Sequence, residues 1–425
     1  MLVDRRYGVM SLISKVPRPI KLVAAVMFFF ELGFGFVDPW WAIYIDKITS
    51  NYLLTGVVIA LFSVTGLLVA LPLGQVIDQF NHKQIIRASL IMYLAVAALY
   101  FAAGYNSSIP LLILAVLVNG ISSVIIYETS QAYIDRHYQG DKSFNYAFVV
   151  SLDALGYLVG TLAVLAVIAW WPIYYGYLVV AMFILFTLLI ARRLPTTSEP
   201  AVNLGNLLSE IISKKILHRA LQALPHYPVF FYVQIACIFF ILFINFGFLV
   251  FLPLFGVEQH LSLIEVGLVA ILFQVPIFLS AYYATLIERL AKRFIVLIFF
   301  CLIALLMMMF YIWHSSVAFY IISFFLSSAL TILNITVRPV LFSLSPSHLE
   351  GEAASITKFA EKLATVTAPL IVGWLAAVSG INTSYVLFAV LAAILGVVSF
   401  YFYERYQAVP IVQVRHIKPI HRSGN

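Results

Sequence analysis

Two acidic residues inside one apolar stretch are the first candidates for chemistry. Glu31 lies about nine residues past the start of an apolar run that begins after Lys21, and Asp38 follows seven positions later. Seven residues make two helical turns, so the two carboxyls are expected on one helix face. A charge in the bilayer interior costs at least about 2.5–3.5 kcal/mol, so an acid kept there is a functional candidate. The pair could pass a proton or hold a cation; the alternative is a neutral, hydrogen-bonded Glu31 that only packs.

Other charged residues lie nearer the ends of apolar runs. Asp153 is a further candidate for proton coupling or substrate binding, with local pairing as the alternative. Lys358, Glu361 and Lys362 open another run, and their spacing favours an ordinary surface pair at i,i+3 or i,i+4. Glu361 and Lys362 therefore rank below the acids as site candidates.

The amino-acid composition indicates the class of protein in which these side chains lie. The chain has 425 residues, of which 63% are hydrophobic and 10% charged, against roughly 25% charged in soluble domains. This composition excludes a soluble domain, a disordered chain and a disulfide scaffold. Its two cysteines, Cys237 and Cys301, both lie within apolar runs and are expected to be free thiols.

The apolar runs predict an all-α membrane protein with twelve transmembrane helices. About 20 apolar residues cross a hydrocarbon core of about 30 Å. The twelve runs are 22–45, 53–77, 85–104, 109–133, 145–169, 172–191, 229–254, 264–286, 294–313, 317–340, 357–378 and 383–403.

The basic residues predict the orientation. With the N-terminus in the cytoplasm, 21 of the 25 Lys and Arg fall in cytoplasmic segments and only Lys47 falls outside. This bias places both termini in the cytoplasm. The net charge of +7 then reflects membrane orientation, and no nucleic-acid partner is implied.

The runs divide the chain into two six-helix bundles. We expect an N-terminal bundle over 1–191, a cytoplasmic linker over 192–228, a C-terminal bundle over 229–404 and a cytoplasmic tail over 405–425. Within the linker, 204–224 has the pattern of an amphipathic helix that lies on the inner membrane surface.

A repeat supports the division into halves. In the first inner loop a small residue, an acid four positions later and a basic residue recur 210 positions further on. The two sets are Gly74, Asp78 and Lys83, and Ala284, Glu288 and Arg293. Phe34-Gly35-Phe36 also returns as Phe246-Gly247-Phe248. Parallel repeats of six helices place a substrate site near mid-membrane, between the halves.

The same repeat predicts a gate. Glu128 and Arg338 are counterparts, 210 residues apart, and both lie toward the cytoplasmic ends of their runs. Opposite charges at equivalent positions can meet across the axis when the inner mouth closes, which would stabilise an outward-facing state. The alternative is that each residue pairs within its own half.

These motifs resemble the major facilitator superfamily over nearly the whole chain. Gly74, Asp78 and Lys83 match the family's loop between spans 2 and 3, which is identified with conformational switching; the counterpart loop holds Glu288 and Arg293. Asp135-Arg136 is similar to the family's span 4–5 loop, and Glu350-Gly351-Glu352-Ala353 to its second-half counterpart. Gly156-x-x-x-Gly160 is similar to a glycine pattern of the family's antiporters, and these small residues are expected to allow close helix packing. Asp153 resembles, by position, an acid that couples protons in some multidrug exporters of the family.

The resemblance implies secondary active transport by alternating access rather than catalysis. The sequence has no nucleophile elbow, zinc-binding helix or phosphate-binding loop, so no enzyme, metal or cofactor is expected. We expect a monomer in the plasma membrane that couples a proton, or another cation, to the export of hydrophobic or cationic small molecules. The alternatives are an uptake symporter of the same fold and a non-transporting membrane sensor.

Overall fold

The computed structural model describes residues 16–79, 81–136, 142–196, 225, 227–287, 290–313, 315–344 and 350–407. The regular elements of these residues are helices. The first group comprises α2 (Arg18–Phe34), η1 (Asp38–Trp40), α3 (Trp41–Thr49), α4 (Tyr52–Gln79), α5 (His82–Asn106), α6 (Ile109–Arg136), α7 (Lys142–Leu165), η2 (Ile173–Tyr175) and α8 (Gly176–Ala191). The second group comprises α11 (Val229–Glu258), α12 (Leu263–Phe278), α13 (Ser280–Ile287), α14 (Lys292–Ile312), α15 (Ser316–Ser343), α16 (Glu350–Ser379) and α17 (Ile381–Gln407).

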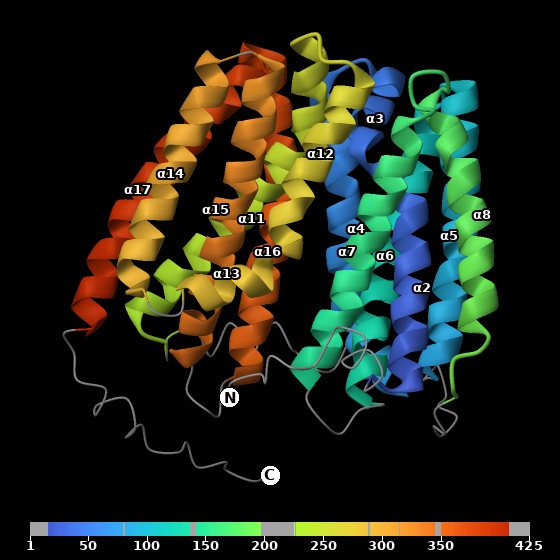
Figure 1. Ribbon diagram of the computed structural model, residues 1–425, viewed down its shortest axis with the longest axis horizontal. Helices are drawn as coiled ribbons and strands as arrows, with labels where there is room; N and C mark the ends of the chain where they lie inside the picture. Colours follow the sequence, from blue (N-terminus) through green and yellow to red (C-terminus); the bar gives the residue numbers. More distant parts are fainter. Residues whose placement is uncertain are drawn as a thin grey trace, which may run out of the picture.

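The two groups of helices stand side by side as two bundles (Figure 1). In the first group α2 packs against α7 and α8, and α5 packs against α6. In the second group α14 packs against α15 and α17, and α11 packs against α16. The groups meet where α4 contacts α16, α7 contacts α12, and α3 contacts α11. The cavity described below lies at this junction.

Polar side chains cap the starts of two helices, α5 and α12. Asn81 accepts a hydrogen bond from the backbone N–H of Lys83 at 3.0 Å and so caps α5. Ser262 and Glu265 form a reciprocal capping box at the start of α12. Such caps satisfy backbone N–H groups that have no partner within the helix. They fix the short connections between long apolar helices.

Two glycines bring α7 into backbone contact with α2. A Cβ atom at Gly156 would lie 2.2 Å from the carbonyl oxygen of Phe28, and one at Gly160 would lie 2.2 Å from that of Leu32. No side chain fits at either position, so the prediction that these small residues permit close packing is confirmed. The contact fixes α7, which carries Asp153, against the helix that carries Glu31.

The first apolar run, predicted over 22–45, forms one candidate membrane span over Arg18–Thr49, but its helix is interrupted. Helix α2 ends at Phe34, and after a turn the chain continues as η1 and α3. Gly35 permits the turn to lie against α7, because a Cβ there would stand 2.4 Å from the carbonyl oxygen of Tyr157. Pro39 then fits the start of η1, where its missing N–H is not needed. The expectation that Asp38 follows Glu31 by two turns of one continuous helix is therefore wrong.

The run over 264–286 is also interrupted. It forms α12 and α13, which are separated at Leu279, and Pro276 lies within the last turn of α12. Proline has no N–H to continue the helical ladder, and the Ser327 hydroxyl donates to the carbonyl oxygen of Phe273 in this turn at 2.5 Å. Among the described helices, eleven segments are long and apolar enough to cross a membrane, with α12 as a shorter apolar helix. These eleven segments indicate a multi-pass membrane protein.

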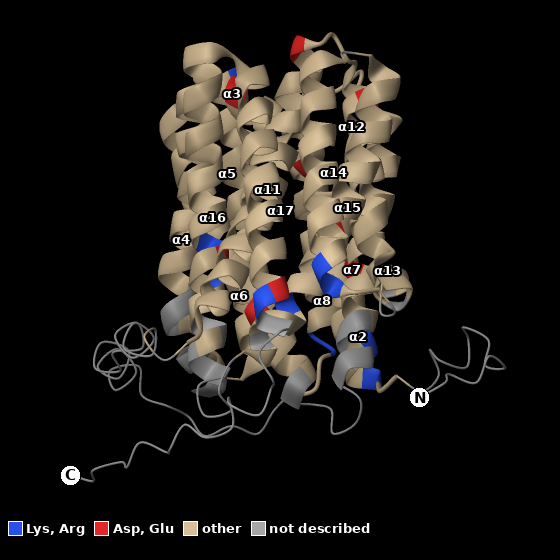
Figure 2. Cartoon of the chain, turned by 90° about the vertical axis from the view of Figure 1, so that its left-hand side faces the viewer, with Lys and Arg blue, Asp and Glu red and all other residues tan. Residues whose placement is uncertain are grey.

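Lys and Arg residues gather toward one end of the bundle. Figure 2 shows the blue Lys and Arg positions mainly at the end where α2 begins, with few at the opposite end. The opposite end, which carries α3 and the connection between α11 and α12, is the top of Figure 1 and is called the upper end below. The predicted amphipathic helix over 204–224 lies outside the described residues.

Candidate functional site

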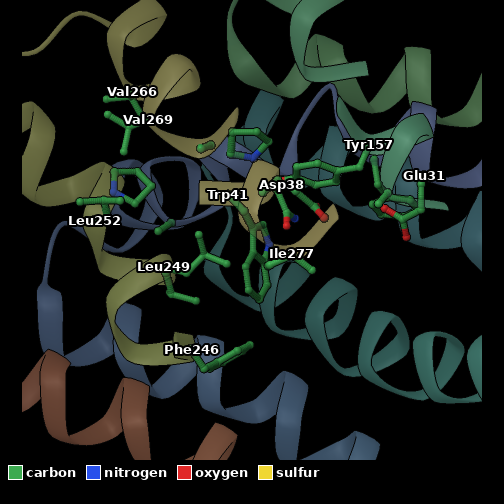
Figure 3. A pocket seen from close by; sticks show the side chains of 18 of the residues that line it. Glu31, Asp38, Trp41, Tyr157, Phe246, Leu249, Leu252, Val266, Val269 and Ile277 are labelled. Atoms are coloured by element: carbon green, nitrogen blue, oxygen red, sulfur yellow. The ribbon is translucent and has the colours of Figure 1, made fainter. Parts of the chain in front are cut away.

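A cavity of about 430 Å³ lies between the two groups of helices (Figure 3). This volume is within the range of pockets that bind small molecules. Its lining comes from α2 to α7 on one side and mainly from α11 and α12 on the other. The polar residues of the first side are Glu31, Asp38, Tyr93, Asn119, Ser123, Tyr127, Asp153 and Tyr157.

Glu31 is the most deeply placed carboxyl of the cavity. Glu31 is only 7% exposed, although it lines the cavity from α2. The Tyr127 hydroxyl, from α6, donates a hydrogen bond to Glu31 Oε1. A buried carboxyl needs such a partner, because an unpaired charge in an apolar environment is expensive. The burial that the sequence predicted for Glu31 is confirmed.

Asp38 opens η1, directly after the interruption of the first span. Unlike Glu31, it is exposed, and it lines the cavity. Figure 3 shows Asp38 beside Trp41, with Tyr157 and Glu31 further along the same wall. The two carboxyls interact electrostatically. Although the helix between them is broken, they face one cavity, which is what the prediction required of them.

Asp153 completes a set of three acids on the first side. It lies on α7, lines the cavity and interacts electrostatically with Glu31. Its Oδ1 atom is buried, and no hydrogen-bond partner for it occurs among the residues that the structure describes. An unpaired buried oxygen is unusual and calls for an explanation such as an exchangeable proton or a ligand.

The opposite wall has a different chemistry. The residues contributed by α11 and α12, such as Phe246, Leu249, Val266 and Val269, are apolar (Figure 3). Gln274 is the one polar side chain on this wall among the described lining residues. The described lining as a whole contains no Lys, Arg or His. The cavity therefore offers three carboxyl groups on one side and an apolar surface on the other.

Hydrogen bonds join the two groups of helices at the upper end. The Trp40 indole N–H donates to the carbonyl oxygen of Leu263 at 3.0 Å, and the Tyr52 hydroxyl donates to Glu258 Oε1 at 2.5 Å. Trp40 is fully buried. Trp40 fills the junction between the groups, and Trp41 lines the cavity.

The predicted gate residues have other partners in this conformation. Arg338 Nη2 lies 2.7 Å from Glu361 Oε1, and Arg338 Nε donates to Asn334 at 2.5 Å. Both partners belong to the second group of helices, as the alternative of pairing within one half anticipated. Glu128 interacts electrostatically instead with Lys362, from α16 across the junction. Whether Glu128 and Arg338 meet in another conformation stays a prediction.

Glu361 connects two basic residues. Besides Arg338 it pairs with Lys358 at 3.4 Å, which confirms the i,i+3 spacing that the sequence suggested. Glu361 is only 8% exposed, so the pair is not the ordinary surface pair that was expected. Arg338 comes from α15 and Lys358 from α16, so Glu361 ties these two helices together.

Of the switch-loop residues, Lys83 and Arg293 are described, and neither is among the described residues that line the cavity. Lys83 lies in the first turn of α5, and Arg293 lies in the first turn of α14 with its guanidinium 4.8 Å from the Phe294 ring centre. Gly74 and Asp78 fall within α4, but their side chains are outside the described part. Glu288 is outside the described residues altogether. The roles of these residues in conformational switching stay predictions.

Several cavity residues were missed by the sequence. Tyr93, Asn119 and Gln274 line the cavity but stand in apolar runs, where nothing distinguishes them from packing residues. The interruption signalled by Gly35 and Pro39 could have pointed to this place, because broken helices in transporters often flank a binding site. Among the described residues, no group of three or more His, Cys, Asp or Glu side chains could hold a metal ion.

The sequence over residues 23–365 matches the family profile described as Major Facilitator Superfamily. The chain belongs to this superfamily. It is therefore a member of a family of membrane transporters, and its fold agrees with that membership. No protein with a curated function matches the chain by sequence.

Two solved structures of the superfamily's fold are similar to this one. The human organic anion transporter MFSD10 (TETRAN) superposes with a TM-score of 0.63 at 15% identity, over 91% of this chain and 100% of the other. The nucleoside transporter NupG superposes with a TM-score of 0.71 at 13% identity, over 92% of this chain and 100% of the other. At these low sequence identities, the structural similarity shows a shared fold and nothing further.

Proposed function

We propose that this major facilitator protein is a proton-coupled transporter that exports hydrophobic or cationic small molecules. The observation that carries the proposal is the asymmetry of the cavity. Its first wall holds Glu31, Asp38 and Asp153, its second wall is apolar, and its described lining contains no basic residue. A lipophilic cation is complementary to such a cavity. A carboxylate pairs with its charge, and the apolar wall contacts its hydrophobic part.

The same asymmetry separates the cavity from one suited to anions. The human structural neighbour is an organic anion transporter. An anion needs cationic or N–H partners, and here three acids surround the space that it would enter. We therefore favour a cation over an anion as the substrate of this chain.

The carboxyls divide between two roles in our proposal. Glu31 is buried and receives a hydrogen bond from Tyr127, so it carries the coupling proton. Asp38 is exposed to the cavity and meets the charge of the substrate. Asp153, with its unpartnered Oδ1 and its electrostatic interaction with Glu31, shares the proton site. When a cation enters, its charge favours loss of the proton from this set of acids, which links the two movements.

The membrane arrangement in this proposal has twelve spans and cytoplasmic termini. The interrupted pair α12 and α13 supplies the twelfth span, and the end rich in Lys and Arg faces the cytoplasm (Figure 2). The hydrogen bonds from Trp40 and Tyr52 then close the external end. In a Cys301→Ser background, Ser50→Cys and Gly380→Cys should each react with an impermeant maleimide from outside intact cells. Labelling only after lysis would overturn the orientation.

Proteoliposomes with an imposed pH gradient test the function. Tetraphenylphosphonium, a lipophilic aromatic cation, serves as the probe. An exporter coupled to protons should move it against the direction of proton flow and stop when an ionophore collapses the gradient. Movement in the same direction as the protons would indicate a symporter. A protein that binds the probe but does not transport it under a pH gradient of either direction would be a sensor.

A further inference from the structure

A buried tyrosine behind the cavity holds two side chains of the cavity wall. Tyr100 lies on α5, is 1% exposed and is not among the described residues that line the cavity. Its hydroxyl accepts one hydrogen bond from Trp41 Nε1 at 3.2 Å and another from Asn119 Nδ2 at 3.3 Å. Trp41 and Asn119 line the cavity from α3 and α6. One buried oxygen therefore fixes residues of two different helices.

The Tyr100 hydroxyl is itself held in place. The Tyr100 ring stacks on the Tyr177 ring of α8, with 4.6 Å between ring centres and 15° between their planes. The backbone carbonyl of Tyr100 accepts a hydrogen bond from the Tyr44 hydroxyl at 2.5 Å. A ring packed in this way has little rotamer freedom. The acceptor that Trp41 and Asn119 share is thus a fixed point of the first bundle.

Trp41 occupies a decisive part of the wall. In Figure 3 it stands beside Asp38, in the middle of the cavity. Its ring meets the Phe62 ring edge-on at 5.7 Å. An indole N–H is only a donor, so it is fixed wherever it finds an acceptor. The Tyr100 hydroxyl therefore fixes the aromatic surface that stands next to Asp38.

We propose that Tyr100 is a positioning residue that decides which cations fit beside Asp38. Its hydroxyl holds the Trp41 indole and the Asn119 amide in the orientations that shape the cavity at this point. Without the hydroxyl, the indole is free to turn and the surface that would stack against an aromatic cation is lost. The effect on substrates rests on the proposed function, whereas the effect on Trp41 does not.

The test compares Tyr100→Phe with Tyr177→Phe. Each change removes one buried tyrosine hydroxyl, but that of Tyr177 has no hydrogen-bond partner among the described residues. Tyr100→Phe should weaken tetraphenylphosphonium binding by about 5–10-fold, the size expected from one or two hydrogen bonds, and leave the maximal transport rate nearly unchanged. Tyr177→Phe should bind as the wild type does. Equal affinities in the two variants would overturn the proposal.

A second measurement needs no ligand. The tryptophans are replaced by 5-fluorotryptophan, and the Trp41 signal is assigned by its loss in Trp41→Phe. The fluorine spectrum should show this signal shifted or split in Tyr100→Phe and unchanged in Tyr177→Phe. An unchanged signal in both contradicts the positioning role. A shifted signal in a protein that binds no tetraphenylphosphonium supports the role of Tyr100 and overturns the proposed substrate class instead.

A third variant covers the case in which Tyr100→Phe does not fold. Benzothienylalanine at position 41 keeps the shape of the Trp41 ring and removes only its N–H. It should weaken tetraphenylphosphonium binding by a factor similar to that of Tyr100→Phe. When the two changes are combined, their effects should not add, because they break the same hydrogen bond. Wild-type binding by the benzothienylalanine variant would also overturn the proposal.

Discussion

The two halves of the chain share a motif and use it differently. Phe34-Gly35-Phe36 in the first half and Phe246-Gly247-Phe248 in the second are 212 positions apart. The first marks the end of α2, while the second lies inside the continuous helix α11. Asp38 and Pro39 follow the first motif, and Pro at the start of η1 begins a new helix there. In the second half, the next proline is Pro253, further along.

The chemistry of equivalent positions differs in the same way. At the same offset, Asp38 corresponds to Val250, and both residues line the cavity. Glu31 corresponds to Phe243, which is buried in the second group. The repeat thus preserves helix packing, while the described cavity-lining residues that can carry charge all stand in the first half. We infer that the first half performs the charge chemistry and that the second half supplies fit.

The largest expected effect comes from the carboxyl of Glu31. Glu31→Gln keeps the hydrogen-bond acceptor and removes the exchangeable proton, so accumulation driven by a pH gradient should fall to the level of protein-free vesicles. Binding of the probe should persist, since Asp38 is unchanged. The control is Glu404→Gln, which removes an exposed carboxyl at the end of α17. Full accumulation by Glu31→Gln at several pH values would contradict the proton role.

The second prediction compares counterparts across the repeat. Asp38→Asn should weaken tetraphenylphosphonium binding about 30-fold, or about 2 kcal/mol, because a charge partner in a confined site is lost. Val250→Ala, at the equivalent place in the second half, removes only apolar surface and should change affinity by less than about threefold. Isothermal titration of both variants checks this. Similar losses in the two would show that charge and fit are not divided between the halves.

A smaller effect is expected in the switch loop. The family resemblance predicts that Asp78 ties the inner end of span 2 to the start of span 11. Asp78→Asn should therefore slow turnover about tenfold, corresponding to about 1.4 kcal/mol, and leave affinity within about twofold. Glu288→Gln, its counterpart, should show the same kind of change. Loss of affinity with turnover intact would exclude the assigned role in conformational cycling.

Periodicity and hydropathy were enough to predict helices, the first buried acid and the close packing at Gly156 and Gly160. They could not predict that the first span breaks after Phe34, because an interrupted helix keeps the hydropathy of a continuous one. They also could not place Trp40, since its burial depends on the second bundle, which supplies its acceptor at Leu263. Hydropathy patterns predict which segments are helical, whereas contacts between the two bundles determine the surroundings of residues such as Trp40.

The same limit explains the pairing of Arg338. The repeat predicted Glu128 as its partner, because counterparts in two halves lie at similar depth. The structure pairs Arg338 with Glu361 on α16, a helix whose neighbour relations are not visible in the spacing. The cavity wall gives a further case, since Tyr100 acts through Trp41 and Asn119 without lining the cavity itself.

The last prediction concerns the inner gate, where the expected shifts are a few-fold. Glu128→Arg and Arg338→Glu should each favour the inward-open state, and the double variant should largely restore the balance. The readout is the rate at which an impermeant maleimide, added from the cytoplasmic side, modifies Val150→Cys in a Cys301→Ser background. Val150 is exposed and lines the cavity, so its labelling reports access to it. Purely additive effects would show that Glu128 and Arg338 do not interact.

The contacts in this conformation sharpen that test, because they provide a rival partner for Glu128. Arg338 is bound to Glu361, so a gate with Glu128 requires it to exchange one carboxylate for another. Glu361→Gln removes the competing charge and should then slow labelling about three- to fivefold, as about 1 kcal/mol would. If Lys362, which already interacts with Glu128, is the partner instead, Lys362→Gln should speed labelling and Glu361→Gln should not slow it. The changes in the labelling rate of Val150→Cys caused by Glu361→Gln and Lys362→Gln therefore identify which residue pairs with Glu128.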